Sequence, residues 1–184
     1  MNQQVQNQKT VYADDGYRPN VGIILSNNQG QVFWARRISG DGWQFPQGGL
    51  NPHESLIDGM YRELLEETGI HQQQVQLLAH TNSWLHYDLP KRYLRRKDGH
   101  GRSNFKGQKQ IWFMLRLLEE DIQPNFELAD KPEFDHWEWV NYWYALDHIV
   151  SFKRDVYQKA LSELEHFLPK YEEHEVFEEK MDEK

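Results

Sequence analysis

Short apolar runs alternate with turn-forming residues along most of this chain, a pattern typical of a domain built on a β-sheet. Residues 21–25 (VGIIL) form a continuous apolar run, as expected of a strand that is buried on both faces. The turn sequence Asn-Asn-Gln-Gly separates this run from residues 31–35, so the two segments predict a hairpin. The same criteria predict further strands at 75–81, 84–87, 110–117 and 134–140.

A central helix is predicted from the residues that begin and end it. Asn51 can serve as the N-cap, Pro52 suits the first helical position, and Glu54 stands three residues after Asn51, as in a capping box. Gly69 suits the left-handed residue that ends a helix. Between these ends, an apolar arc that should face a core is formed by Ile57, Met60, Tyr61 and Leu64.

A second helix is predicted at 151–168, between a capping serine and Pro169. Strands around a central helix, followed by a C-terminal helix, favour the α/β class with a mixed sheet between helices. No repeat or linker divides the chain, so we expect one domain at 12–169. A polar, disordered tail at 1–11 should precede it, and an acidic tail at 170–184 should follow it.

The composition excludes several kinds of chemistry. A chain of 184 residues is long enough for one domain with a sizeable core. The absence of cysteine excludes disulfides and thiol catalysis, so a metal site would have to use oxygen ligands or histidine. The apolar runs are too short to span a bilayer, and residues 1–10 do not resemble a signal peptide. We therefore expect a cytoplasmic protein with no membrane partner, and we favour a monomer.

The charge is unevenly distributed. The net charge of −8 by itself argues against a nucleic-acid partner. However, residues 172–184 hold seven acids and two lysines, whereas residues 91–109 hold a single acid. That second segment could follow a phosphate backbone, or it could be a solvated surface loop. Its eight basic residues are Lys91, Arg92, Arg95, Arg96, Lys97, Arg102, Lys106 and Lys109.

Three glutamates crowd one end of the central helix and suggest a metal site. Glu63, Glu66 and Glu67 should fall within about 100° of arc on the helix surface. Such a cluster is unfavourable unless a positive charge lies among the acids, and hard divalent cations prefer carboxylate oxygens. Arg62 lies one turn before Glu66 and could orient it. Because carboxylate-bound Mg²⁺ usually acts on phosphates, we expect Mg²⁺, or Mn²⁺ in its place, and a phosphate-containing substrate.

The whole pattern around these acids resembles the Nudix box. It reads Gly48, five residues, Glu54, seven residues, then Arg62-Glu63-Leu64-x-Glu66-Glu67-x-Gly69-Ile70. The resemblance implies an α/β/α sandwich and an enzyme that hydrolyses nucleoside diphosphates linked to another group. We expect Glu54 to hold the entrance of the helix. The carbonyl near Gln47 could add one more oxygen to the metal site.

Five further segments resemble one branch of this family, the bacterial RNA pyrophosphohydrolases. The resemblance runs from about residue 15 to 168 and rests on YRPNVG (17–22), WQFPQGG (43–49), GQKQ (107–110), PEFD (132–135) and SFKRDVY (151–157). It implies removal of pyrophosphate from the 5′ end of triphosphorylated RNA, leaving a monophosphate and promoting mRNA decay. Hydrolysis of dinucleoside polyphosphates or other nucleotides is the main alternative. A non-catalytic RNA-binding module is a third, which the intact box disfavours.

The resemblance also implies further residues of the catalytic site. Glu133 matches a family carboxylate that completes the active site, so we expect it to be a catalytic residue and a fourth metal ligand. Glu66 and Glu67 are the catalytic residues expected within the box. The general base could be Glu66 or Glu133, and the sequence leaves both possibilities open.

Five residues are expected to bind the substrate. Arg18 and Arg37 match family positions that bind phosphate. Phe152 beside Lys153 offers an aromatic face next to a cation, the combination that holds single-stranded RNA ends, and the family uses the matching pair there. Tyr87 is a candidate for the same pocket.

Overall fold

The computed structural model describes residues 15–40, 42–94, 105–129 and 131–169, and the sheet of this part has eight strands. Its central order is β3-β2-β1-β7-β5, with β4 paired to β1, β6 to β7 and β8 to β2. β1 and β7 run parallel and the other paired strands are antiparallel, so the sheet is mixed. The strands are β1 (Tyr17–Ser26), β2 (Gln31–Arg37), β3 (Trp43–Gln44), β4 (Gln47–Gly49), β5 (Val75–His80), β6 (Leu85–Asp88), β7 (Gly107–Leu117) and β8 (Phe134–Asn141).

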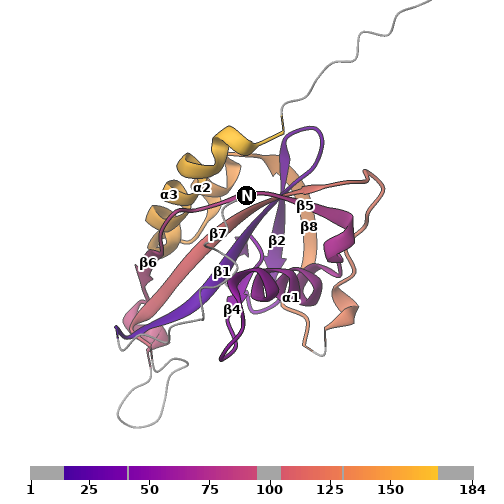
Figure 1. Ribbon diagram of the computed structural model, residues 1–184. Coiled ribbons are helices and arrows are strands. Elements are labelled where there is room, and N and C mark those ends of the chain that lie inside the picture. Colours follow the sequence, from indigo (N-terminus) through magenta and orange to yellow (C-terminus); the bar gives the residue numbers. More distant parts are fainter. Residues whose placement is uncertain (1–14, 41, 95–104, 130, 170–184) are drawn as a thin grey trace, which may run out of the picture.

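Helices cover both faces of this sheet. α1 (Leu56–Thr68) lies on one side, and α2 (Tyr144–His148) and α3 (Arg154–Leu164) lie on the other (Figure 1). This arrangement confirms the expected α/β/α sandwich. Short 3₁₀ turns complete the described part: η1 (Gln72–Gln74), η2 (Lys91–Tyr93), η3 (Phe126–Leu128), η4 (Ser151–Lys153) and η5 (Glu165–Phe167).

Alternation along the central strands divides the interior into two cores. Successive side chains of a strand point to opposite faces. On β1, Ile23 accordingly belongs to the core under α1, and Ile24 belongs to the core under α3. On β7, Phe113 and Trp112 divide in the same way. Because both faces are covered, these strands are apolar at almost every position, which is why their sequences read as continuous apolar runs.

The central helix begins later than predicted. Its N-cap is Ser55, whose Oγ accepts a hydrogen bond from the Asp58 N–H at 3.1 Å, so the prediction of Asn51 as N-cap was wrong. The reason is the backbone of His53, whose φ of 67° interrupts the helical run. The predicted contact between Asn51 and Glu54 does exist in the loop before the helix, because the Asn51 N–H donates to Glu54 Oε2 at 2.9 Å. Gly69 ends the helix in the left-handed conformation, as predicted.

The second helix is shorter than predicted. Residues 151–153 form a 3₁₀ turn, the α-helix starts at Arg154 without a side-chain cap, and it ends at Leu164. The short elements β3, β4 and α2 were not predicted, because they are too brief to show a periodic pattern. The predicted tails at 1–11 and 170–184 lie outside the described residues, so the domain limits of 12 and 169 stay predictions.

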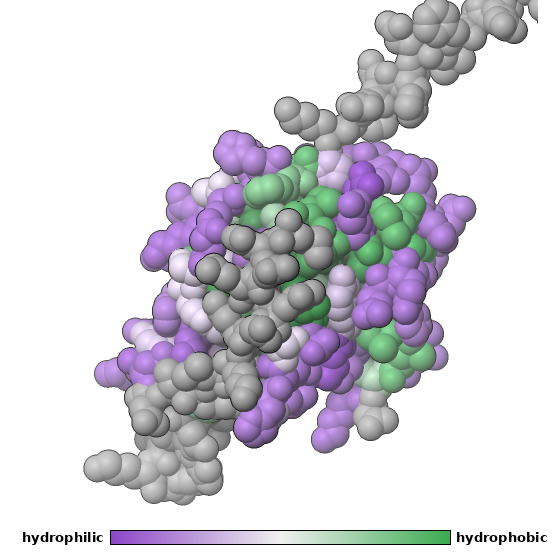
Figure 2. All heavy atoms as spheres, viewed as in Figure 1, coloured by the Kyte–Doolittle hydropathy of each residue, from purple (hydrophilic) through white to green (hydrophobic). Residues whose placement is uncertain are grey.

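The surface is mainly polar. Figure 2 shows hydrophilic residues over most of the described surface on this face, with smaller hydrophobic patches between them. None of the helices in the described ranges combines the length and the apolar character needed to cross a membrane.

A substitution at Gly22 should destabilise the fold. A Cβ atom at this position would lie 2.5 Å from the ring of Trp112, which is fully buried on the neighbouring strand. We expect Gly22→Ala to lower the free energy of unfolding by about 1–3 kcal/mol, measured by denaturant titration. Trp112→Phe would make room for the methyl group, so the losses of the two variants should be less than additive in the double variant. Fully additive losses would contradict the proposed clash.

Candidate active site

The acidic residues of α1 differ in burial. The Glu63 and Glu67 side chains are buried, whereas the Glu66 side chain is half exposed. The Gln47 N–H donates to Glu67 Oε2 at 2.8 Å, which fixes the carboxylate of α1 against β4. Glu63 and Glu67 are therefore buried where the helix meets the short strand β4, and Glu66 lies at the surface.

Arg62 connects the loop before α1 to these glutamates. Its guanidinium donates to Glu63 Oε1 at 2.8 Å and to Glu66 Oε2 at 3.0 Å, which confirms the prediction that it could orient Glu66. It also donates to both oxygens of Glu54, at 2.7 and 2.9 Å, and to the Gly49 carbonyl at 2.9 Å. The guanidinium holds the pKa of Glu54 below its usual value. Glu54 thus holds the helix entrance, as expected.

The two glycines of β4 leave space for charged groups. A Cβ at Gly48 would lie 1.9 Å from the carboxyl carbon of Glu63. A Cβ at Gly49 would lie 2.1 Å from Nη2 of Arg18. Neither position could carry a larger residue without moving the charged side chain beside it.

Negative charge in this region is incompletely neutralised. Burial raises the pKa of Glu67 well above its ordinary value, and the charges of Glu133 and Glu63 raise it further. Burial is also the main cause of the raised pKa of Glu63, against which the hydrogen bond from Arg62 acts. A positive charge placed among these carboxylates would stabilise their ionised forms.

The acidic residues suit a divalent cation by the chemistry of their side chains. Carboxylate oxygens are the ligands that Mg²⁺ and Mn²⁺ prefer. In the conformation described, Glu63 and Glu66 turn to Arg62, and the Glu133 carboxylate lies 3.7 Å from Arg37 Nη2. Among the described residues, no group of three or more Asp, Glu or His side chains is arranged to hold a metal ion. The predicted ligand set therefore stays a prediction.

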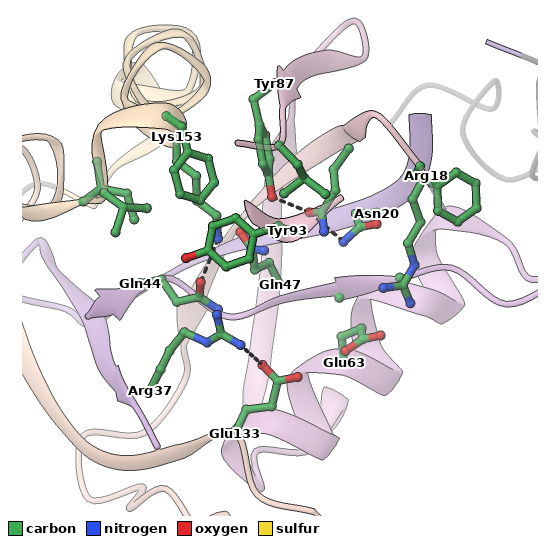
Figure 3. Close-up of a pocket in the computed structure, with 18 of the residues that line it drawn as sticks. Arg18, Asn20, Arg37, Gln44, Gln47, Glu63, Tyr87, Tyr93, Glu133 and Lys153 are labelled. Carbon is green, nitrogen blue, oxygen red and sulfur yellow. Dashed lines mark hydrogen bonds and ion pairs between the residues drawn. The ribbon is translucent and has the colours of Figure 1, made fainter. Parts of the chain in front are cut away.

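A cleft of about 590 Å³ opens beside these acids. Three of the predicted catalytic or metal-binding residues line it, namely Glu63, Glu66 and Glu133, whereas Glu67 is not among the lining residues. All five predicted substrate-binding residues also line it: Arg18, Arg37, Tyr87, Phe152 and Lys153. Figure 3 shows Arg18, Arg37, Tyr87 and Lys153 converging from different elements, together with Glu63 and the Arg37–Glu133 ion pair.

The part of the cleft formed by η4 is aromatic and cationic. The Phe152 ring lies 5.9 Å from the ring of Tyr87, with the two planes inclined by 47°. Lys153 is buried, lies 5.8 Å from the Tyr87 ring centre and donates from Nζ to Gln44 Oε1 at 2.8 Å. This part of the cleft offers aromatic surface beside a fixed positive charge.

Sequence reasoning missed several residues of the cleft. Gln108 accepts hydrogen bonds from the Tyr87 hydroxyl and from Asn20 Nδ2, the latter at 3.1 Å. Gln44 orients Lys153, and Tyr93 places a further ring beside Phe152. Gln44 and Gln108 lie within segments that carry the family resemblance, so that signal could have singled them out. Tyr93 had no such signal.

The basic segment at 91–109 differs in part from the prediction. Lys109 is buried, and its Nζ donates to Asp15 Oδ2 at 2.8 Å, so its charge does not face solvent and the prediction for this residue was wrong. Lys106 Nζ lies 4.2 Å from the centre of the Tyr17 ring. Lys91 and Arg92 are exposed. The remaining basic residues, at 95–97 and 102, lie outside the described residues.

The comparison with protein families decides the classification. The model of the NUDIX domain matches residues 16–160, which include β4, α1 and all the residues that line the cleft. The chain belongs to the Nudix family. Nudix hydrolases generally need divalent metal ions, which agrees with the acidic character of the residues on α1.

Curated relatives resemble most of the chain. An RNA pyrophosphohydrolase from Pseudomonas fluorescens (strain SBW25) is 55% identical over 150 residues, which cover 82% of this chain and 92% of that protein. An RNA pyrophosphohydrolase from Stenotrophomonas maltophilia (strain K279a) is 53% identical over 150 residues, covering 82% of this chain and 71% of that protein.

Solved structures of other proteins share the fold at low sequence identity. The E. coli dihydroneopterin triphosphate pyrophosphohydrolase aligns with a TM-score of 0.61 at 19% identity, over 78% of this chain and 95% of that one. A C. elegans Ap4A hydrolase binary complex aligns with a TM-score of 0.57 at 15% identity, over 77% of this chain and 93% of that one. At these identities the likeness concerns the fold, and the α/β/α Nudix arrangement is confirmed.

Proposed function

We propose that this Nudix enzyme removes pyrophosphate from the 5′ end of triphosphorylated RNA and leaves a 5′ monophosphate, a reaction that promotes mRNA decay. One observation supports this most directly. A single cleft joins the acidic residues of the Nudix box to a cationic and aromatic region at η4. A polyphosphate could reach the acids while the adjoining nucleotides contact the aromatic rings. The names of the relatives agree with this substrate.

We propose Mg²⁺ as the physiological ion, with Mn²⁺ able to replace it. Glu63, Glu66 and Glu67 would hold the ion, with Glu133 as a fourth ligand. When bound, the ion would neutralise phosphate oxygens and lower the pKa of a water molecule that attacks the phosphoanhydride. Glu66 or Glu133 would accept a proton from that water. Because Arg62 contacts both Glu63 and Glu66, it would act as a positioning residue.

Charged and aromatic residues of the cleft would bind and orient the RNA. Arg18 and Arg37 would contact the polyphosphate, since both line the cleft together with the acidic residues. Lys153, held by Gln44, would present a fixed charge to the RNA end. The Phe152 ring would stack on a base, and Tyr87, which Gln108 holds through a hydrogen bond, would support that ring from the side.

A paired-substrate assay tests this function. We expect a higher kcat/KM for a short, unstructured RNA carrying a 5′ triphosphate than for a dinucleoside tetraphosphate, because the RNA can use the aromatic part of the cleft. Phe152→Ala should raise the KM for the RNA by about 5- to 100-fold, the usual range for loss of one stacking ring. Pyrophosphate release measures both reactions.

The control for this assay is Phe167→Ala, which removes an exposed ring that does not line the cleft. It should leave both substrates unaffected. A clear preference of the unsubstituted enzyme for the dinucleoside tetraphosphate would refute the RNA assignment and favour the alternative substrate class. Absence of hydrolysis of either substrate, with Mg²⁺ or Mn²⁺, would favour a non-catalytic RNA-binding module.

A further inference from the structure

Tyr93 places an aromatic ring beside Phe152. It belongs to η2 (Lys91–Tyr93), where its N–H donates to the Pro90 carbonyl at 2.8 Å. Its ring centre lies 5.8 Å from that of Phe152, and the two planes are inclined by 46°. Both residues line the cleft, and the Tyr93 ring lies among the lining side chains in Figure 3.

Three aromatic residues meet here, but they are anchored differently. Tyr87 is buried within the core under α3, and Phe152 is partly buried and packs against that core. Tyr93 is half-buried and is not a member of either hydrophobic core of the described residues. Phe152 therefore has a fixed neighbour in Tyr87 and a neighbour in Tyr93 that is held by a short turn. A shift of the Tyr93 ring would therefore disturb neither core directly.

The ring spacing is close to that of a stacking site. A flat base held between two parallel rings needs ring centres about 7 Å apart, twice the ~3.4 Å separation of stacked bases. The centres of Phe152 and Tyr93 need to move apart by only about 1 Å to reach this spacing. The planes are inclined by 46°, so the rings would also have to turn toward parallel for a base to lie flat against both.

The charge around Tyr93 suits an RNA ligand. The Arg92 guanidinium carbon lies 4.9 Å from the centre of the Tyr93 ring, and Arg92 and Lys91 are both exposed on the same turn. Lys153 lies in the same cleft. Aromatic faces beside cationic side chains are the usual means of holding unpaired bases and their phosphates. An apolar ligand would gain nothing from these charges.

We propose that a nucleobase near the 5′ end of the RNA stacks between Phe152 and Tyr93, which makes Tyr93 a specificity-determining residue. The inference rests on the proposed function and adds to it a second face of the base-binding site. It also predicts a preference for unpaired 5′ ends, because a base can enter between two rings only when it is not paired or stacked in a helix.

Kinetic comparison of Tyr93 variants tests this role. Tyr93→Ala should raise the KM for a 5′-triphosphate RNA by about 5- to 100-fold with little change in kcat, because stacking is lost while the acidic residues are untouched. Tyr93→Phe keeps the ring and should match the unsubstituted enzyme. The matched control is Tyr144→Ala, which removes a partly exposed tyrosine ring outside the cleft and should leave the KM unchanged.

RNAs that lack a single base identify the nucleotide involved. In three RNAs, an abasic residue replaces the first, second or third nucleotide in turn. The KM increase caused by Tyr93→Ala should disappear on one of the three RNAs, since that RNA has no base left to stack. A parallel binding experiment places 2-aminopurine at the same position of the RNA. Its fluorescence should fall when the RNA binds the unsubstituted enzyme, and should fall less when the RNA binds the Tyr93→Ala variant.

Two results would overturn the stacking role. The first is an unchanged KM for Tyr93→Ala on intact RNA. The second is a KM increase in Tyr93→Ala that is equal on all three abasic RNAs, or that comes with a lower Tm of the variant. A residue with a merely structural role would behave in this way. Hydrolysis of the intact RNA by the unsubstituted enzyme distinguishes failure of the stacking role from failure of the proposed function. If it does not hydrolyse the intact RNA, the function itself is refuted, whereas normal hydrolysis with unaffected Tyr93→Ala refutes only the stacking role.

Discussion

Glu67→Gln should lower kcat by roughly 10²- to 10⁴-fold while leaving the fold intact. The Glu67 side chain is buried, and its Oε2 accepts the Gln47 N–H at 2.8 Å. Glutamine has the same shape and keeps an oxygen for this hydrogen bond, so the substitution mainly removes a negative charge. A cation bound by the remaining carboxylates would be held less tightly, and the developing charge on the phosphates would be less well compensated. Pyrophosphate release under saturating RNA measures the effect.

The thermal stability of Glu67→Gln, unlike its activity, should not fall. Burial and the charges of Glu133 and Glu63 raise the pKa of Glu67 in the folded protein. A carboxyl group with a raised pKa in the folded state costs stability once the pH exceeds its unfolded pKa, and a neutral amide avoids this cost. The Tm at pH 8 in the presence of a chelator should therefore be equal or higher. Glu119→Gln, at an exposed position outside the cleft, is the control. Full activity of Glu67→Gln would contradict the metal assignment.

Gly48→Ala should reduce kcat by about 10²-fold with little effect on folding. The new Cβ would lie 1.9 Å from the carboxyl carbon of Glu63, so that carboxylate would have to move. A displacement of about 1 Å in an active site is enough for a loss of this size. The carboxylate is the end of a flexible side chain, and Gly48 is not among the described glycines with positive φ, so the backbone should tolerate alanine. The Mg²⁺ concentration for half-maximal activity should also rise.

The neighbouring glycine provides a matched control for this prediction. A Cβ at Gly49 would lie 2.1 Å from Nη2 of Arg18, a proposed phosphate-binding residue. Gly49→Ala should therefore raise the KM for RNA and leave the Mg²⁺ dependence nearly unchanged. If both variants shifted the Mg²⁺ dependence equally, or if Gly48→Ala kept full activity, the assignment of Glu63 as a metal ligand would be in error.

Much of the fold could be predicted because its main strands have strong local patterns. The runs at 21–25 and 110–117 are apolar at almost every position, and both proved to belong to central strands that are covered on both faces. The prediction was poorer where the pattern was short or where tertiary contacts dominate. β3 and β4 have two and three residues, and the start of α1 is displaced by the positive φ of His53.

The candidate site was predicted to a similar extent. The resemblance singled out Arg18, Arg37 and Phe152, and all three line the cleft. Charge counting alone was less successful, because it treated Lys109 as an exposed cation when this residue is buried against Asp15. A count of charges along a segment cannot tell which of them face solvent, since that depends on the strands packed beside the segment.

The sequence by itself determined the central helix, its acidic face and the family, because these depend on spacing within one continuous segment and on the fixed period of a helix. Only the tertiary structure decided which residues share the cleft. Lys153 meets Gln44, 109 positions away, and Lys109 meets Asp15, 94 positions away. Contacts over such separations follow from strand order and register, which local patterns do not encode.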